Sequence, residues 1–356
     1  MPPSLLGLTC AQWSSLGRRL FIEARGEAKG SGVAAKLYRN FFRTGSLGPE
    51  TAGLSPASRT LWESVAGEVR PLGLEHLADD EHGAAKAVFG LADGSRIETV
   101  LVPMGAGRAT LCVSSQVGCA MGCAFCETGR VGLRRNLDAT EIVAQVHTAR
   151  FGLGWDFSSL VFMGMGEPLD NLDALVQALK VLLDPAGVAF AQERITVCTA
   201  GLSAGIEALA AQGWKRMGLS LSLNSATNQK RERLMPVTRS NPLEALQTAL
   251  AAYPMRPNFV LALNYCLLPG INDAEQDARD IAAFAQGLGR TLVNLIPYNP
   301  GTRPLTRAPT EAEVDAFLGY LKGADLEAKV RGPKGRSIRA ACGQLGASKV
   351  PAILDS

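Results

Sequence analysis

Histidine is scarce in this chain of 356 residues, and long apolar runs are missing. The three histidines, His76, His82 and His147, lack the spacing of metal ligands, which disfavours histidine-based metal sites and Ser-His-Asp catalysis. No stretch approaches the roughly 20 apolar residues that a membrane-crossing helix needs. The amino terminus has no basic segment followed by an apolar one. We therefore expect no signal peptide, no membrane partner and a cytoplasmic location.

The chain has eight cysteines, which is too few for a disulfide scaffold at this length. In a reducing compartment, such a number indicates metal binding or thiol chemistry.

The net charge of +3 is distributed unevenly. Residues 1–45 carry seven Lys/Arg and two acidic residues, and residues 321–356 carry seven and three. The part between them is therefore acidic. Two basic ends are typical of a protein that contacts a polyanion, but they can equally be solvated faces. Charge alone leaves both interpretations open.

Apolar spacing divides the chain into four parts. Residues 1–85 are predicted to form a small helical domain, since apolar residues recur at helical intervals from Trp13 onward. Residues 86–108 resemble a β-hairpin that turns at Asp93-Gly94. Residues 109–328 alternate strands and helices, and residues 329–356 form a basic carboxy-terminal segment.

The alternating part predicts six parallel strands, at residues 109–113, 160–163, 194–199, 217–222, 258–266 and 291–295. Helices are predicted to begin near residues 140, 172, 203, 242, 274 and 311. Asn241 and Thr310 are the predicted caps of the helices near 242 and 311. We expect an α/β fold, a partial (βα)6 barrel similar to a TIM barrel, with its chemistry at the carboxyl ends of the strands.

Three cysteines follow the first predicted strand at CxxxCxxC spacing: Cys119, Cys123 and Cys126. Three thiolates can hold three irons of a 4Fe-4S cluster, which usually has four cysteine ligands. Since no fourth cysteine is near in the sequence, one iron would stay open for a small-molecule ligand. A structural zinc site is the alternative, but it normally has a fourth Cys or His. The pattern favours the cluster.

A glycine-rich turn, residues 162–168, follows the second predicted strand. Its glycines allow close approach of the backbone to a ligand, and Glu167 could accept hydrogen bonds from an ammonium group. Taken alone, this segment is an ordinary turn between a strand and a helix.

Together these motifs resemble the radical-SAM signature, and further segments are similar to the RlmN/Cfr family of RNA adenosine methyltransferases. The similar segments are residues 108–119, 164–169, 294–300 and 340–345, and the resemblance extends from about residue 5 to 346. It implies a radical-SAM barrel in which S-adenosylmethionine binds the open iron through its amino and carboxylate groups. Cleavage of that cofactor would then produce a radical.

The resemblance also implies roles for individual residues. Cys342 would carry the methyl group, with two molecules of S-adenosylmethionine consumed per turnover. Cys112 would resolve the protein–RNA adduct through a transient disulfide with Cys342, and Glu98 would accept a proton. The residues implied for binding S-adenosylmethionine are Gly166, Glu167, Cys198, Ser222, Leu223, Asn224 and Asn299. The electron donor would be a flavodoxin-type system, and the partner would be ribosomal or transfer RNA.

This chain departs from the family pattern at three places near the pocket. Cys198 replaces a serine, Asn224 replaces a histidine, and residues 127–129 read Glu-Thr-Gly where Ser-Thr-Ala is usual. These departures bear on the choice of RNA more than on the chemistry.

Cys342 is flanked by five cations, at positions 329, 331, 334, 336 and 339, which should ease the ionisation of its thiol. The alternative interpretation of Cys342 is a buried small apolar residue. Cys10 and Cys266 have no such flanks, and we predict that they are structural.

The leading hypothesis is methylation at C2 of an adenosine. Three alternatives are methylation at C8, a radical-SAM enzyme that acts on a peptide or small molecule, and an RNA-binding protein stabilised by zinc or a cluster. The pairing of Cys112 with Cys342 and the basic ends favour an RNA-modifying enzyme.

Overall fold

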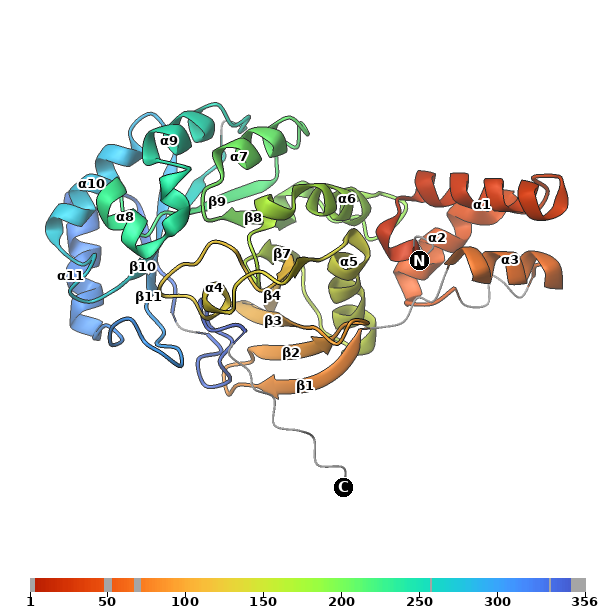
Figure 1. The fold of residues 1–356 in the computed structure, drawn as a ribbon, viewed down its shortest axis with the longest axis horizontal. Helices are drawn as coiled ribbons and strands as arrows, with labels where there is room; N and C mark the ends of the chain where they lie inside the picture. The colour runs from red at the N-terminus through yellow and green to blue at the C-terminus, as the bar shows by residue number, and fades with distance from the viewer. Residues whose placement is uncertain (1–3, 48–52, 67–71, 257, 333, 347–356) are drawn as a thin grey trace, which may run out of the picture.

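The computed structural model describes residues 4–47, 53–66, 72–256, 258–332 and 334–346. A helical module at the amino end projects from one side of a barrel-like sheet that is covered by helices (Figure 1). Within the described ranges, no helix is both long and apolar enough to cross a membrane.

The helical module has a small aromatic core. Trp13 and Trp62 pack with their ring centroids 5.0 Å apart, and Gly17 leaves room for the Trp62 ring because a side chain there would overlap it. The first helix begins at a capping box made by Thr9 and Gln12, which satisfies two backbone donors. The helices of the module are α1 (Cys10–Arg25), α2 (Ala34–Thr44) and α3 (Pro56–Ala66).

Helix α2 of the module packs against helix α5 (Ala139–His147) of the barrel, and this contact joins the two parts. The Phe41 ring stacks on the His147 ring at 4.8 Å, and Phe151 lies against the same imidazole. The Cys10 amide donates to Asp184 at 2.7 Å. Burial lowers the pKa of His147 to about 4, so this stacked ring stays neutral near neutral pH.

The large sheet has ten strands, of which the last seven are parallel and follow the order of the chain. In spatial order the strands are β1 (Gly73–Asp79), β2 (Ala85–Gly90), β3 (Arg96–Gly105), β4 (Arg108–Cys112), β7 (Ser159–Phe162), β8 (Ile195–Thr199), β9 (Gly218–Ser222), β10 (Leu261–Leu267), β11 (Thr291–Pro297) and β12 (Ala328–Val330). A second, two-stranded sheet consists of β5 (Gln116–Val117) and β6 (Arg135–Asn136).

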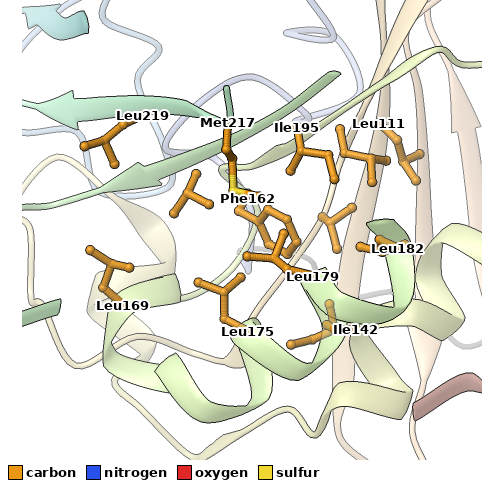
Figure 2. Packing of buried hydrophobic residues seen from close by; sticks show 14 of the residues in the cluster. Leu111, Ile142, Phe162, Leu169, Leu175, Leu179, Leu182, Ile195, Met217 and Leu219 are labelled. Carbon is orange, nitrogen blue, oxygen red and sulfur yellow. The ribbon is translucent and has the colours of Figure 1, made fainter. Parts of the chain in front are cut away.

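The parallel strands are buried because helices cover their outer face. The helices are α4 (Glu127–Val131), α5 (Ala139–His147), α6 (Leu172–Leu183), α7 (Ser203–Ala210), α8 (Asn228–Leu234), α9 (Leu243–Ala251), α10 (Glu275–Ala285) and α11 (Glu311–Gly323). Figure 2 shows Leu175 and Leu179 of α6 packed against Phe162 of β7. Full burial of such side chains contributes about 1.5–3 kcal/mol each. A β/α barrel with helices outside is therefore the observed architecture.

All six predicted parallel strands and their helices are present, with ends that differ by a few residues. The prediction missed β12, a seventh parallel strand. It was also wrong for residues 73–79, which form β1 instead of part of the helical domain. The predicted hairpin corresponds to β2 and β3, and β3 pairs with β4, so these strands extend the barrel sheet. The division of the chain into domains remains a prediction.

The carboxy-terminal segment, residues 331–346, runs from β12 to the antiparallel strands. Gly335 donates to Asp80 after β1 at 2.9 Å, and Gly346 donates to Glu98 of β3 at 3.2 Å. Lys86 of β2 donates to the Arg339 carbonyl at 3.2 Å. The segment therefore connects the two ends of the sheet and carries Cys342 into the barrel.

Candidate active site

An open cavity lies at the carboxyl ends of the parallel strands. Residues from the loops after β4 and β7, from the ends of β8 to β11, and from the carboxy-terminal segment line it. This is the position at which the fold predicts chemistry.

The three cysteines of the CxxxCxxC motif all line this cavity. Their loop is closed at its base by the pairing of β5 with β6, and the Cys119 amide donates to the Gly132 carbonyl at 3.1 Å. Gly118 has φ +81°, and a side chain there would collide with that carbonyl, so the turn requires glycine.

Burial raises the pKa of Cys119 to about 12 and raises those of Cys123 and Cys126 as well. The negative charge of each neighbouring thiolate opposes ionisation of Cys119 and Cys123 further. Such a set of thiols needs a cationic partner to ionise together, and it therefore fits an iron–sulfur cluster. Over the described part of the chain, no three His, Cys, Asp or Glu side chains converge on a single metal ion, whereas in a 4Fe-4S cluster each thiolate binds a different iron.

Three further cysteines lie on the same cavity wall: Cys198, Cys266 and Cys342. The sequence placed no fourth cysteine near the motif, but the fold brings these three together with it. Cys266 lines the cavity, where burial and the charges of Cys342 and Cys126 raise the pKa of its thiol, and its predicted structural role stays a prediction.

Glu167 is fully buried in the turn after β7, and both carboxylate oxygens accept backbone hydrogen bonds. Oε2 accepts from the Ala200 amide at 2.6 Å and Oε1 from the Leu169 amide at 3.1 Å. Burial raises the pKa of Glu167 to about 7, although these hydrogen bonds oppose the shift. Gly166 precedes it at φ +103°, and a side chain there would come within 2.6 Å of Gln116. The turn thus holds a carboxyl group on the cavity wall.

Polar side chains at the ends of β8 and β9 line the cavity. The Cys198 thiol lies 3.6 Å from the Ser222 hydroxyl, and Asn264 donates to the Cys198 sulfur at 3.2 Å. Asn224 adopts φ +56° and accepts from the Cys266 amide at 2.8 Å. Leu223 differs from its neighbours because its side chain packs in the hydrophobic core. Only its backbone remains near the site.

Arg231 of α8 is a functional residue that sequence reasoning missed. Its guanidinium is fully buried and donates to the carbonyls of Ala200, Ser222 and Leu223, and to the Thr238 hydroxyl. It therefore ties the ends of β8 and β9 together. Burial lowers its pKa to about 10, and the negative charges of Cys123 and Glu167 oppose this shift.

A second, larger cavity lies beside the first, and Cys342 lines both. Met163 and Ile296 are the other residues that the two cavities share. Cys112 lines the second cavity but not the first, and so does Asn299, which was predicted to bind S-adenosylmethionine. The structure therefore brings the two predicted catalytic cysteines to one cavity.

Three of the five cations near Cys342 also line the second cavity: Lys329, Arg331 and Lys334. Desolvation by the surrounding protein raises the pKa of the Cys342 thiol, although the residue is exposed at its surface. Arg331 acts in the predicted direction and lowers this pKa, but its effect is smaller. Burial and the nearby charge of Cys342 likewise raise the pKa of Cys112.

Glu98 lines neither cavity. Its buried carboxylate lies 3.5 Å from the Lys86 ammonium and accepts a hydrogen bond from the Gly346 amide. The other carboxylate oxygen accepts no hydrogen bond from the described residues. Glu98 therefore holds the end of the segment that carries Cys342. Because it lines neither cavity, it does not contact the reacting atoms directly.

Comparison with known proteins adds to this geometry. Residues 113–282 match the model of the radical SAM superfamily. A dual-specificity RNA methyltransferase RlmN from Syntrophobacter fumaroxidans is 46% identical over 270 residues, which cover 75% of this chain and 77% of that protein. A probable RlmN 1 of Protochlamydia amoebophila is 37% identical over 89% of this chain and 88% of its own length. The crystal structure of a radical SAM methyltransferase from Sphaerobacter thermophilus superposes with a TM-score of 0.86 at 33% identity, covering 98% of this chain and 100% of that one.

Proposed function

Because this chain belongs to the RlmN family of radical-SAM RNA methyltransferases, we propose that it methylates C2 of an adenosine in ribosomal or transfer RNA. We propose further that the carbon passes from S-adenosylmethionine to the RNA through an S-methyl group on Cys342. The observation that carries this proposal is the position of Cys342 on the wall between the two cavities.

The smaller cavity suits the cofactors. Cys119, Cys123 and Cys126 would hold a 4Fe-4S cluster there, and the Glu167 carboxylate would accept hydrogen bonds from the ammonium group of S-adenosylmethionine. When bound, the cluster would supply the electron that cleaves S-adenosylmethionine to the radical needed for hydrogen abstraction. We propose Gly166, Cys198, Ser222, Asn224 and the Leu223 backbone as the remaining contacts.

The larger cavity suits the target nucleotide, because it alone of the two contains Cys112 and the cations. Lys329, Arg331 and Lys334 would bind phosphates, and the adenine would leave its stack to enter the cavity. Asn299 lines this cavity too, so we propose that it lies where cofactor and nucleotide meet.

The chain's own residues would act in sequence. Cys342 accepts a methyl group on its sulfur and presents it to the base, whose C2 is not nucleophilic enough for direct methyl transfer. After the S-methyl group has lost one hydrogen atom, its carbon would bond to C2, and the adduct would give up the C2 proton and return one electron to the electron-transfer system. The Cys112 thiolate would then attack the Cys342 sulfur, so that the disulfide forms, the carbon–sulfur bond breaks, and its electron pair stays on the carbon, which takes up a proton. We propose Glu98 as the final acceptor of the C2 proton. Two molecules of S-adenosylmethionine, a flavodoxin-type electron donor and a cytoplasmic location complete the proposal.

Nucleoside mass spectrometry of total RNA from cells with and without the gene tests this function. We expect 2-methyladenosine to disappear from ribosomal or transfer RNA when the gene is deleted. Loss of 8-methyladenosine instead would establish the alternative regiochemistry. No change in any methylated adenosine would refute the proposed function.

Replacing Cys342 separates the carrier step from the radical step. We expect Cys342→Ala to bind the cluster and cleave S-adenosylmethionine but to leave RNA unmethylated, because the carbon has no sulfur to bind. The matched variant Cys112→Ala should accumulate a covalent protein–RNA adduct, visible by denaturing gel electrophoresis. Normal RNA methylation by Cys342→Ala would contradict the carrier role.

A further inference from the structure

Glu127 stands immediately after Cys126, at one of the positions where this chain departs from its family. It is the first residue of α4, and its carboxylate is buried. The mechanism proposed above does not use it. Three segments that are far apart in the sequence meet at this residue: the cysteine loop, the loop after β11 and the Cys342 loop.

The carboxylate of Glu127 binds the loop after β11. Oε1 accepts from the Thr302 amide at 2.9 Å, and Oε2 accepts from the Thr302 hydroxyl at 2.8 Å. Arg130, one turn later in α4, donates to Oε1 at 3.1 Å. Gly301 packs so closely on the carboxylate that a side chain at this position would overlap it. Three donors thus fix the orientation of this acid.

The backbone at the same place binds the Cys342 loop. The Glu127 amide donates to the Gly343 carbonyl at 2.8 Å, and the Thr128 hydroxyl donates to the Leu345 carbonyl at 2.7 Å. Gln344 donates to the Pro300 carbonyl at 3.2 Å, which closes the contact between all three segments. Because Glu127 follows Cys126 and Gly343 follows Cys342, one hydrogen bond links the neighbours of the two cysteines.

We propose that Glu127 is a positioning residue that sets where the Cys342 sulfur stands relative to the cysteine loop. Its carboxylate holds the start of α4 against Thr302, and α4 in turn holds the Cys342 loop. This inference rests on the proposed carrier role of Cys342 and assigns the residue that orients it. Misplacement of a reacting atom by about 1 Å can lower a rate by as much as a hundredfold.

The test is Glu127→Gln in the cluster-loaded, full-length protein. The glutamine oxygen can still accept from the Thr302 amide and Arg130, but its amide nitrogen replaces the oxygen that accepts from the Thr302 hydroxyl, and the negative charge is lost. We expect S-methylation of Cys342, followed by peptide mass spectrometry, to slow by about tenfold to a hundredfold. The amount of cluster, seen in its electron paramagnetic resonance signal, and reductive cleavage of S-adenosylmethionine should stay near the wild-type values.

Glu275→Gln is the matched control. Glu275 is also the first residue of its helix and also pairs with an arginine one turn later, Arg279, but it is exposed and lines neither cavity. We expect this variant to behave as wild type. Thr302→Ser keeps the hydroxyl donor and should retain most of the S-methylation, whereas Thr302→Val should slow it.

A second readout needs neither RNA nor S-adenosylmethionine. We expect iodoacetamide to alkylate Cys342 faster in Glu127→Gln than in wild type, by about tenfold, because the loop is released. Equal alkylation and equal S-methylation would overturn the proposal, and so would a parallel loss of cluster, cofactor cleavage and S-methylation. If wild type itself never acquires an S-methyl group on Cys342, the proposed function fails instead, and the alkylation result still decides the loop contact.

Discussion

At the scale of single residues, Glu167 combines burial with a pKa of about 7. The carboxylate form is the one that can accept hydrogen bonds from an ammonium group. Below pH 7, binding of S-adenosylmethionine must therefore also displace a proton. By the same linkage, this group favours the folded state at low pH, and that contribution is lost as the pH rises from about 4.5 to about 7.

We predict that the Kd of S-adenosylmethionine rises by up to about tenfold for each pH unit below 7 and levels off above it. Glu167→Gln should bind more weakly at all pH values and lose this dependence. Isothermal titration calorimetry of the cluster-loaded protein between pH 6 and pH 8 measures both effects. The exposed Glu311, changed to Gln, is the control. An identical pH slope in Glu167→Gln and wild type would refute the assignment of the titrating group.

Cys266 shows at the same scale why residue roles were only partly predictable. The CxxxCxxC motif is local in the sequence, so spacing alone indicated its chemistry. Cys266 lies alone in a strand, and only the curvature of the sheet brings it to the wall with Cys342 and Cys126. The rise in the pKa of Cys342 could not be predicted from the sequence either. It depends on the protein packed around the thiol, whereas the sequence shows only the flanking cations.

At the scale of elements, the buried Arg231 connects α8 to the ends of β8 and β9. Arg231→Met would leave three carbonyls and one hydroxyl without their charged donor in the interior. We predict that the free energy of unfolding falls by about 3–5 kcal/mol. We also expect weaker binding of S-adenosylmethionine, because Ala200 both accepts from Arg231 and donates to Glu167.

Urea unfolding followed by circular dichroism measures this stability change. Arg239→Met is the matched control, since Arg239 is exposed and pairs with Glu232 at the surface. Its effect should be at most about 1 kcal/mol. Equal destabilisation by the two substitutions would show that the carbonyls near Arg231 do not depend on it.

Helix and strand periodicity predicted most elements of the barrel, and the exceptions have physical causes. The strand β12 has only three residues, too few for a pattern. The capping box at Thr310 was confirmed, but Asn241 does not cap α9, the helix that follows it. Its side chain accepts from the Ser203 amide instead, and Asn228 accepts from Leu243 at the start of α9. A contact between distant segments therefore takes the place of the local cap at α9. Such a contact cannot be predicted from the pattern of one segment alone.

At the scale of the whole molecule, the helical module presents seven exposed cations in its first two helices and the turn between them: Arg18, Arg19, Arg25, Lys29, Lys36, Arg39 and Arg43. Contacts of such residues with phosphates would position RNA without reading its sequence. The contacts that join the module to the barrel are with α5 and with α6 and the residue that follows it. Changes to its surface charge should thus act on RNA binding and leave the radical chemistry intact.

We predict that the combined Arg18→Glu, Arg19→Glu and Arg25→Glu variant binds RNA more weakly and with a smaller salt dependence. Each lost phosphate contact should reduce the slope of log K against log salt by about 0.7 for single-stranded RNA. Fluorescence anisotropy with transfer RNA measures the slope, and cleavage of S-adenosylmethionine without RNA should be unchanged. The same charge reversals at Arg239, Arg279 and Arg290, which are exposed on the surface of the barrel, should leave the slope near wild type. An unchanged slope in the module variant would exclude the module from RNA binding.

The shared wall at Cys342 has a kinetic consequence. A sulfur that faces two compartments can be methylated from one while the other is empty, so the first molecule of S-adenosylmethionine can react before any polynucleotide is bound. Only the second molecule, which supplies the radical, must be present together with the RNA. The form of the protein present before RNA binds would then be the one that already carries a methyl group on Cys342.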